Sequence, residues 1–134
     1  MPFVNVKLLE KQVDESIKAE IITGITDLVC HVMKRERTLT TIVIDDIKPS
    51  SWAIGGKAVD PHSQGVSFVN IKVSKGTTNA EEMALMTKEV KALMSKLLKN
   101  HVEANYFIID ELNPAGWGFG DLTMKERAKL EEES

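Results

Sequence analysis

Pro2 is the residue whose type and position offer the most specific chemistry in this sequence. Proline is small enough for the initiator methionine to be removed in front of it, and we expect that removal to leave a secondary amine at the start of a strand. An α-amino group has an unperturbed pKa of about 7.7 to 8.0, and an apolar environment lowers it because the ammonium form loses solvation. An amine that titrates near the working pH is an efficient general base and general acid. Pro2 therefore predicts proton transfer by an amino-terminal proline, provided that Met1 is removed.

Other chemistry-bearing residues give weaker signals. The sequence has no motif typical of phosphate loops, serine nucleophiles or metal sites. Its histidines occur singly, as His31, His62 and His101. We interpret the one cysteine, Cys30, as a small buried side chain in a helix, and the carboxylates at 45–46 and 110–111 as solvated or capping groups. We therefore predict no metal site and no cofactor.

Two blocks of the sequence recur with a constant offset of 65 residues. FVNVK at residues 3–7 recurs as FVNIK at 68–72, and IVIDDIKPSSWAIGG at 42–56 recurs as FIIDELNPAGWGFGD at 107–121. Two separated blocks with one offset indicate an internal duplication, which must be recognised before the fold is assigned.

Each copy has the pattern of a strand, a helix and a second strand. Alternating apolar residues open both copies, and β-branched or aromatic runs at 41–47 and 106–112 predict the second strands. Asp14 and Asn79 are predicted N-caps, with Glu82 at a capping-box position. The apolar stripes of the two helices are Ile17, Ile21, Ile25, Leu28 and Val32, and Met83, Met86, Val90, Leu93 and Leu97.

This order of elements predicts an α/β fold of tandem β-α-β units. A helix between two strands favours parallel pairing within each unit, and the two units form a four-stranded sheet. Only two helices are expected, so both cover one face of the sheet, and the opposite face is expected to pack on further copies of the chain. The predicted units are residues 1–58 and 67–121, with a linker at 59–66 and a charged tail at 122–134 that is either a solvated helix or a frayed end.

Composition narrows the class of protein. The chain has 134 residues, of which 43% are apolar and 28% charged, and a net charge of −3, which fits one globular domain. No apolar run approaches the roughly 20 residues that cross a bilayer, and an acidic balance is unfavourable for nucleic acid. The N-terminal residues do not have the layout of a signal peptide, and one cysteine cannot form an intramolecular disulfide. We expect a cytoplasmic protein that binds neither nucleic acid nor membranes.

The duplicated units resemble the tautomerase superfamily, and the chain resembles two fused subunits of 4-oxalocrotonate tautomerase. The resemblance rests on PFVNVKLLE at 2–10, the helix capped by Asp14, and the I-x-G-G ending that follows Trp52. It implies that Pro2 moves a proton between carbon and oxygen of a small enol or keto acid. It also implies a homotrimer, since the short subunits of the family assemble as hexamers.

The resemblance suggests further site residues. Trp52 and Trp117 align with the aromatic residue that lines the family's pocket, although packing of the C-terminal turn explains an aromatic there equally well. Tyr106 is a candidate hydrogen-bond donor to an enolate oxygen, with ordinary sheet packing as the alternative. Lys75 is a candidate cation for a substrate carboxylate, with an ordinary exposed lysine as the alternative.

The chain departs from the family at its carboxylate-binding arginines. The matching positions hold Gln12 and Thr41 in the first unit and Thr77 and Tyr106 in the second. Uncharged side chains do not reproduce a bidentate guanidinium contact. The second unit also has Ser67 in place of the proline, and an internal residue supplies no amine. At most one proline site per chain is therefore predicted.

These observations predict a cofactor-free, tautomerase-like isomerase acting on a small enol or keto acid. Two alternatives stay open. The missing arginines favour a catalytically silent member of the fold with a binding or structural role. A dehalogenase or hydratase that keeps its proline protonated is the third possibility, although it also needs cationic groups.

Overall fold

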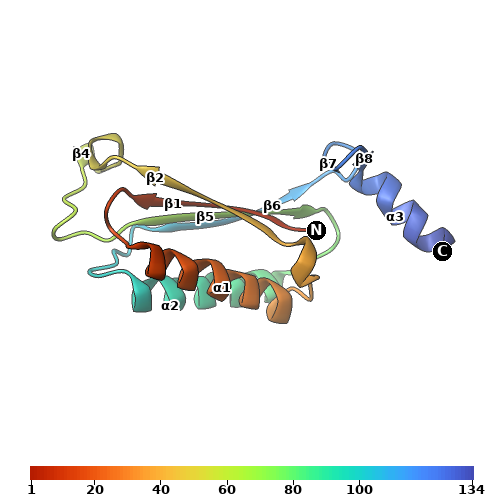
Figure 1. Cartoon of the computed structure of the whole chain (residues 1–134), viewed down its shortest axis with the longest axis horizontal. Helices are drawn as coiled ribbons and strands as arrows, with labels where there is room; N and C mark the ends of the chain where they lie inside the picture. Colours follow the sequence, from red (N-terminus) through yellow and green to blue (C-terminus); the bar gives the residue numbers. More distant parts are fainter.

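The computed structural model describes residues 1–134 as a four-stranded sheet with two helices on one face (Figure 1). The strands of this sheet are β1 (Phe3–Leu9), β2 (Thr41–Ile47), β5 (Ser67–Ser74) and β6 (Tyr106–Leu112), and the helices are α1 (Glu15–Val32) and α2 (Ala80–Leu97). The strand order is β2-β1-β5-β6. β1 is parallel to β2 and β5 is parallel to β6, whereas β1 and β5 are antiparallel. The predicted α/β fold of tandem β-α-β units is confirmed.

The antiparallel pair β1–β5 relates the two units by an approximate two-fold axis. Asn5 lies opposite its own repeat equivalent, Asn70, while Phe3 lies opposite Lys72 and Lys7 opposite Phe68. Each residue of β1 thus pairs with a residue of β5 whose own repeat equivalent lies at the opposite end of the pair. It follows that the start of the first strand in one unit lies beside the end of the first strand in the other.

The core lies between the sheet and the helices. Val4, Val6 and Leu8 alternate along β1 and are fully buried in this core, as the sequence pattern predicts. The buried positions of the helices are Ile21, Ile25 and Val29 in α1 and Met86, Val90 and Met94 in α2. The predicted stripes differ from the buried positions at one place in each helix. Val29 is buried where the stripe predicted Leu28, and Met94 where it predicted Leu93. Leu28 and Leu93 lie along the contact between the two helices.

Both predicted N-caps form. The side chain of Asp14 accepts a hydrogen bond from the Ile17 amide at 2.8 Å, and that of Asn79 accepts one from the Glu82 amide at 2.9 Å. The predicted capping box at Glu82 is wrong, because its carboxylate accepts a hydrogen bond from the Thr78 hydroxyl at 2.9 Å. Thr78 lies just before the N-cap, outside the helix, and its hydroxyl occupies the carboxylate that a capping box would use.

A short hairpin follows each outer strand. The first is β3 (Ala53–Ile54) with β4 (Lys57–Ala58), after a 3-10 turn at Pro49–Ser51, and the second is β7 (Gly118–Phe119) with β8 (Leu122–Thr123). Gly55, Gly56 and Gly120 have φ angles of 62°, 80° and 65°, which side chains with a Cβ rarely adopt. The glycines at the ends of the repeated blocks therefore turn these hairpins.

Residues beyond the second hairpin form a third helix, α3 (Met124–Glu133), which projects from the two-layer body (Figure 1). A capping box starts it, since Thr123 Oγ1 accepts from the Glu126 amide at 3.0 Å and the Glu126 carboxylate accepts from the Thr123 amide at 3.1 Å. None of its residues is buried. Of the two alternatives expected for the tail, the solvated helix is the one that forms, because a polar sequence with a strong cap forms a helix without covering the sheet.

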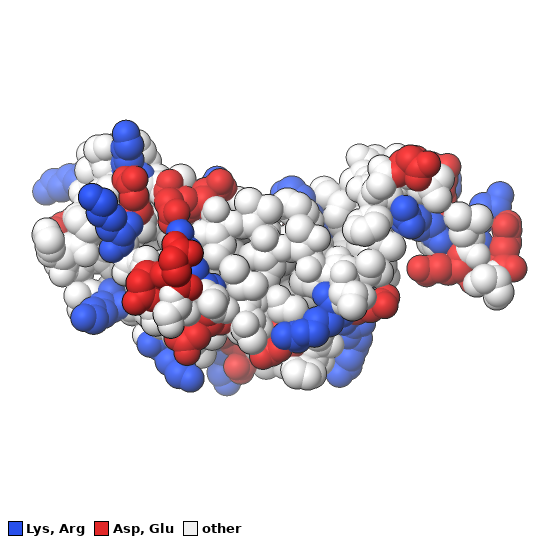
Figure 2. All heavy atoms as spheres, in the orientation of Figure 1, with Lys and Arg blue, Asp and Glu red and all other residues white.

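The face of the sheet opposite α1 and α2 has no covering element. The hairpins rise on that side at opposite ends of the molecule (Figure 1). Its exposed hydrophobic side chains include Phe3, Val43, Tyr106 and Ile108, which are 38%, 41%, 67% and 38% exposed. Figure 2 shows basic and acidic side chains interspersed at the two ends of the molecule, with a largely uncharged zone between them. None of the helices is both long enough and apolar enough to cross a membrane.

The segment between the units is fixed to the end of α2. The Gly65 amide donates to the Asn100 carbonyl at 2.8 Å, and the Val102 amide donates to the Gly65 carbonyl at 2.9 Å. The Gln12 side chain forms two hydrogen bonds with the backbone of Val66, at 3.3 and 3.2 Å. A Cβ at position 65 would collide with the Lys99 carbonyl oxygen. This close approach explains the glycine.

We expect Gly65→Ala to lower the free energy of unfolding by about 1–3 kcal/mol, the usual cost of overpacking against an atom that cannot move away. Urea unfolding followed by circular dichroism measures the change. Gly116→Ala is the matched control, because the nearest atom to its added Cβ is the Asn113 carbonyl oxygen at 3.4 Å. Equal stability of the two variants would contradict the close contact.

Candidate active site

Pro2 is buried at the start of β1, where it lines a cavity of about 120 Å³ that we call the first cavity. Its lining residues are Met1, Pro2, Phe3, Leu39, Thr41, Lys72, Trp117, Gly118, Phe119 and Met124. The last five of these belong to the second half of the chain. The two-fold pairing of β1 with β5 explains this composition, because it brings the end of the second unit to the start of the first.

Trp117 forms an apolar wall of the first cavity. Its indole Nε1 donates a hydrogen bond to Ser74 Oγ at 3.0 Å, which fixes the orientation of the ring relative to β5. Phe119 and Leu39 add further apolar surface. These side chains exclude water from the vicinity of Pro2 and so disfavour a charged amine there.

The electrostatic environment of the chain start is positive. Burial, and then the charge of Arg35, lower the pKa of the amino terminus, which in this structure is the Met1 amine. Glu131 and Glu36 oppose this shift but have smaller effects. Burial also lowers the pKa of Arg35 itself, with an opposing contribution from Glu82. An amine at this end of the chain therefore loses its proton more readily than an exposed one.

Arg35 is a residue that the sequence reasoning missed. Its Nη2 donates to the carbonyl oxygen and to the hydroxyl of Thr77, at 2.7 and 2.9 Å, while its buried Nε has no partner. Thr77 is a position where the resemblance leads one to expect an arginine. The chain thus brings a guanidinium to this place from the segment after α1. The sequence contained no signal for this beyond the scarcity of arginine.

Lys72 is a second cation that the sequence reasoning did not assign to the Pro2 site. Its ammonium donates to Asn70 Oδ1 at 2.5 Å and to Asp110 Oδ2 at 3.2 Å, and Asn70 donates to the same carboxylate oxygen at 2.9 Å. The repeated FVN-x-K block offered a signal, because residues two apart on a strand lie on one face.

The first unit repeats this arrangement. Asn5 Nδ2 and Lys7 Nζ both donate to Asp45 Oδ2 at 3.0 Å. The asparagine, and after it the lysine, hold the pKa of Asp45 and of Asp110 below the usual carboxyl value. Both carboxylates are therefore ionised near neutral pH and position lysines instead of supplying protons.

A second cavity, of about 420 Å³, lies at the position related to the first by the two-fold axis. Its lining residues are Lys7, Ile47, Ser51, Trp52, Ala53, Ser67, Phe68 and Tyr106. Ser67 takes the place of Pro2, Lys7 that of Lys72 and Trp52 that of Trp117. The second cavity is thus the counterpart of the first, without the proline.

The structure distributes the predicted site residues over three places. Pro2 and Trp117 line the first cavity, whereas Trp52 and Tyr106 line the second. Lys75 is exposed in the turn after β5, lines neither cavity, and is held through its amide, which donates to the Leu112 carbonyl at 2.8 Å. The 65-residue offset alone could not show which tryptophan lies beside Pro2. Trp117 of the second unit lines the cavity of Pro2, and Trp52 of the first unit lines the cavity of Ser67.

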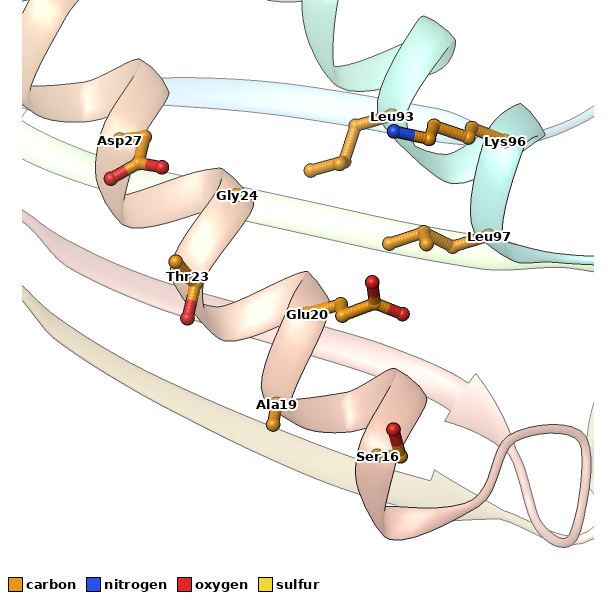
Figure 3. A pocket seen from close by; sticks show the side chains of 9 residues that line it. All are labelled: Ser16, Ala19, Glu20, Thr23, Gly24, Asp27, Leu93, Lys96 and Leu97. Atoms are coloured by element: carbon orange, nitrogen blue, oxygen red, sulfur yellow. The ribbon is translucent and has the colours of Figure 1, made fainter.

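A hollow of about 500 Å³ also lies between α1 and α2, on the helical side of the molecule (Figure 3). Leu93 and Leu97 of α2 point toward α1, where Gly24 leaves room for Leu93 (Figure 3). Glu20, Asp27 and Lys96 surround these side chains. The hollow is therefore the outer side of a helix contact, and it has no part in the site around Pro2. No group of three His, Cys, Asp or Glu side chains in the chain is placed to hold a metal ion.

Comparison with known proteins gives matches over both units. A family model described as "Tautomerase enzyme" matches residues 2–60 and again residues 68–127. "Probable tautomerase K2" of Dickeya dadantii (strain 3937) is 31% identical over 67 residues, which cover 50% of this chain and 100% of that protein. A probable tautomerase of Staphylococcus aureus (strain Mu50) is 38% identical over 56 residues, covering 42% of this chain and 90% of that protein. These relatives have the length of one unit, in agreement with a duplication.

Solved structures match the whole fold. One described as "Q0 fused 4-OT wild type symmetric trimer" has a TM-score of 0.79 at 12% identity and covers 92% of this chain and 96% of its own. Another, described as Pt0534 inactivated by 2-oxo-3-pentynoate, has a TM-score of 0.82 at 9% identity and covers 93% of this chain and 98% of its own. At these identities the likeness concerns the fold alone.

We expect Arg35→Met to raise the pKa of the amino-terminal amine, because removal of a nearby positive charge favours the ammonium form. An NMR titration of the amino-terminal residue measures the shift. Arg37→Met is the matched control, since Arg37 pairs with Asp27 at 2.7 Å on the exposed side of α1. The electrostatic assignment is wrong if both variants titrate like the wild type.

Proposed function

Because the chain belongs to the tautomerase family, we propose that it is a tautomerase in which Pro2, freed by removal of Met1, is the general base and general acid for a small enol or keto acid. The observation that carries this proposal is the burial of Pro2 in an apolar cavity close to a cation. Such surroundings favour the neutral amine near neutral pH, and only a neutral amine accepts a proton.

The reaction needs one group that both accepts and returns a proton. With an enol as substrate, the neutral Pro2 nitrogen takes the hydroxyl proton, and the resulting ammonium returns a proton to the carbon. The substrate is isomerised and the amine is regenerated, so no cofactor or second reactant is consumed. Trp117 and Phe119 exclude competing water from this exchange.

Cationic side chains near the first cavity support an acidic substrate. Lys72 lines the cavity, and Arg35 lies close enough to the chain start to shift the pKa of its amine. A carboxylate placed between these groups would orient the reacting carbon toward Pro2. These cations weaken the alternative of a silent binding or structural protein, which rested on the missing arginines. Lys75, Trp52 and Tyr106 lie outside the first cavity and have no part in this proposal.

Assembly as a homotrimer is part of the proposal. The uncovered face of the sheet exposes Val43, Ile108 and other apolar side chains, and exposed apolar side chains that no element of the chain covers are typical of an interface. Fused relatives of the same fold are described as trimers. Three chains would contain six β-α-β units and three proline sites.

Replacement of Pro2 tests the catalytic proposal. We expect Pro2→Ala to reduce turnover of phenylenolpyruvate by roughly tenfold or more, because a primary amine differs in basicity and position from the proline nitrogen. Intact mass spectrometry first verifies that Met1 is absent, and Pro61→Ala, at an exposed proline of the segment between the units, is the matched control. Equal turnover by wild type and Pro2→Ala would favour the silent protein.

The pH profile of the wild type distinguishes the remaining alternative. A general base is active when neutral, so kcat/KM should rise with pH through the pKa of the free amine. A rate that falls as the amine loses its proton would instead indicate a protonated proline, as in the dehalogenase or hydratase hypothesis.

Light scattering tests the assembly. We expect a mass three times that of the 14.9 kDa chain. Ile108→Glu should dissociate the trimer because it places a charge on the uncovered face of the sheet, whereas Ile22→Glu, on the exposed side of α1, should not. A monomeric wild type would contradict this part of the proposal.

A further inference from the structure

We propose that the second cavity binds a small aromatic carboxylate and that no proton transfer to carbon takes place there. The inference does not depend on Pro2, which lies in the other cavity. It rests on the shape of the second cavity, on one lysine, and on a chain of hydrogen bonds that ends at Ser67.

The second cavity has the size and walls of a site for a planar molecule. Its volume of about 420 Å³ lies within the range of small-molecule sites. Trp52, Phe68 and Ile47 supply flat or apolar surface. The indole of Trp52 also packs against the small buried cluster of Leu9, Val59 and Val66. An aromatic ring therefore finds a wall that is already held in place.

Lys7 supplies the positive charge of the second cavity. Its ammonium contacts Asp45 at 3.0 Å and is 41% exposed. An ammonium has three N–H donors, and this contact occupies one of them. The other donors can bind a ligand carboxylate, although Asp45 reduces the net charge that the ligand meets.

Ser67 supplies a hydrogen bond whose direction the surrounding groups determine. Lys91 Nζ lies 2.8 Å from His101 Nδ1, and Ser95 Oγ lies 3.1 Å from the same nitrogen. An ammonium only donates, so Nδ1 accepts and the ring proton is on Nε2. Nε2 lies 2.8 Å from Ser67 Oγ and therefore donates to it. The chain of donors runs from Lys91 through His101 to the serine oxygen.

This direction leaves the Ser67 hydroxyl proton without an acceptor in the protein. Ser67 is only 2% exposed and lines the second cavity, so the acceptor of this proton has to be a molecule in that cavity. A buried donor without a partner is unfavourable, and an anion in the cavity would satisfy it. The positive charge of Lys91 at the other end of the chain polarises the hydroxyl toward an anion.

The same direction excludes Ser67 as a nucleophile. A serine nucleophile needs an imidazole that accepts its proton, whereas this imidazole donates. Burial, and after it the charge of Lys91, lower the pKa of His101 to about 4, so the ring is neutral near pH 7. Since Ser67 also replaces the proline and is an internal residue, the second cavity has no amino-terminal amine to carry a proton. Its residues bind without catalysing.

Benzoate is the probe for this site. In Trp117→Phe, Trp52 is the only tryptophan, and we expect benzoate to change its fluorescence with a saturable isotherm. Benzyl alcohol lacks the charge and acetate lacks the ring. We therefore expect each to bind at least about tenfold more weakly than benzoate. Equal affinity for benzoate and either control compound, or no saturation with benzoate, would overturn the proposal.

Substitutions in the same Trp117→Phe chain test the residues. Lys7→Met and Ser67→Ala should each weaken benzoate binding by about tenfold, since each removes a hydrogen bond to a charged group. Asp45→Asn should tighten binding, because it removes the carboxylate that competes for Lys7. Lys57→Met, an exposed lysine of the first hairpin, is the control and should change nothing. Opposite effects at two groups 3.0 Å apart cannot come from general loss of structure.

NMR of the His101 ring tests the hydrogen-bond chain independently. We expect the neutral tautomer with the proton on Nε2 near pH 7, and a proton on Nδ1 would overturn the assigned direction. These measurements involve no turnover. A failure of Pro2 catalysis therefore leaves them unaffected, and a failure to bind benzoate leaves the Pro2 proposal intact.

Discussion

The antiparallel pairing of β1 with β5 is the interaction on which the rest of this structure depends. Asn5 lies opposite Asn70, so the two units exchange equivalent residues across the middle of the sheet. Pro2 then meets the Trp117 turn of the second unit, and Ser67 meets the Trp52 turn of the first. A single unit would contain half of each cavity. The fused chain holds both halves in one rigid sheet, without the entropic cost of bringing two subunits together.

The two cavities share a framework but differ in their chemistry. In each, an asparagine and a lysine of the first strand hold an aspartate of the outer strand, and this fixes the lysine beside the cavity. The difference on which the two proposals depend lies at the first residue of each copy. In the proposed function Pro2 offers an amine in a buried place near a positive charge, whereas in the further inference Ser67 offers a hydroxyl proton directed by His101. On these two proposals, one duplicated framework serves proton transfer in one place and anion binding in the other.

The positive charge near Pro2 comes from Arg35, a different position in the chain from those where the family resemblance places an arginine. Electrostatic stabilisation depends on where a charge lies, and a long arginine side chain can bring its charge from several backbone positions. Arg35 starts in the segment after α1 and reaches Thr77, in the turn that precedes α2. The absence of arginine at a matching position therefore does not show that the charge is absent.

The sequence by itself determined the elements, the duplication and the proline. Alternation along Val4, Val6 and Leu8, the caps at Asp14 and Asn79, and the 65-residue offset are local or periodic features, and the fold follows from them because burial of apolar faces leaves few arrangements. Only the tertiary structure decided which turn completes which cavity, that a cation comes from Arg35, and that His101 reaches Ser67. These contacts join segments that no periodicity relates. Their physical cause is the register of the β1–β5 pair and the fixed end of α2, which act over distances in the chain that a sequence pattern does not encode.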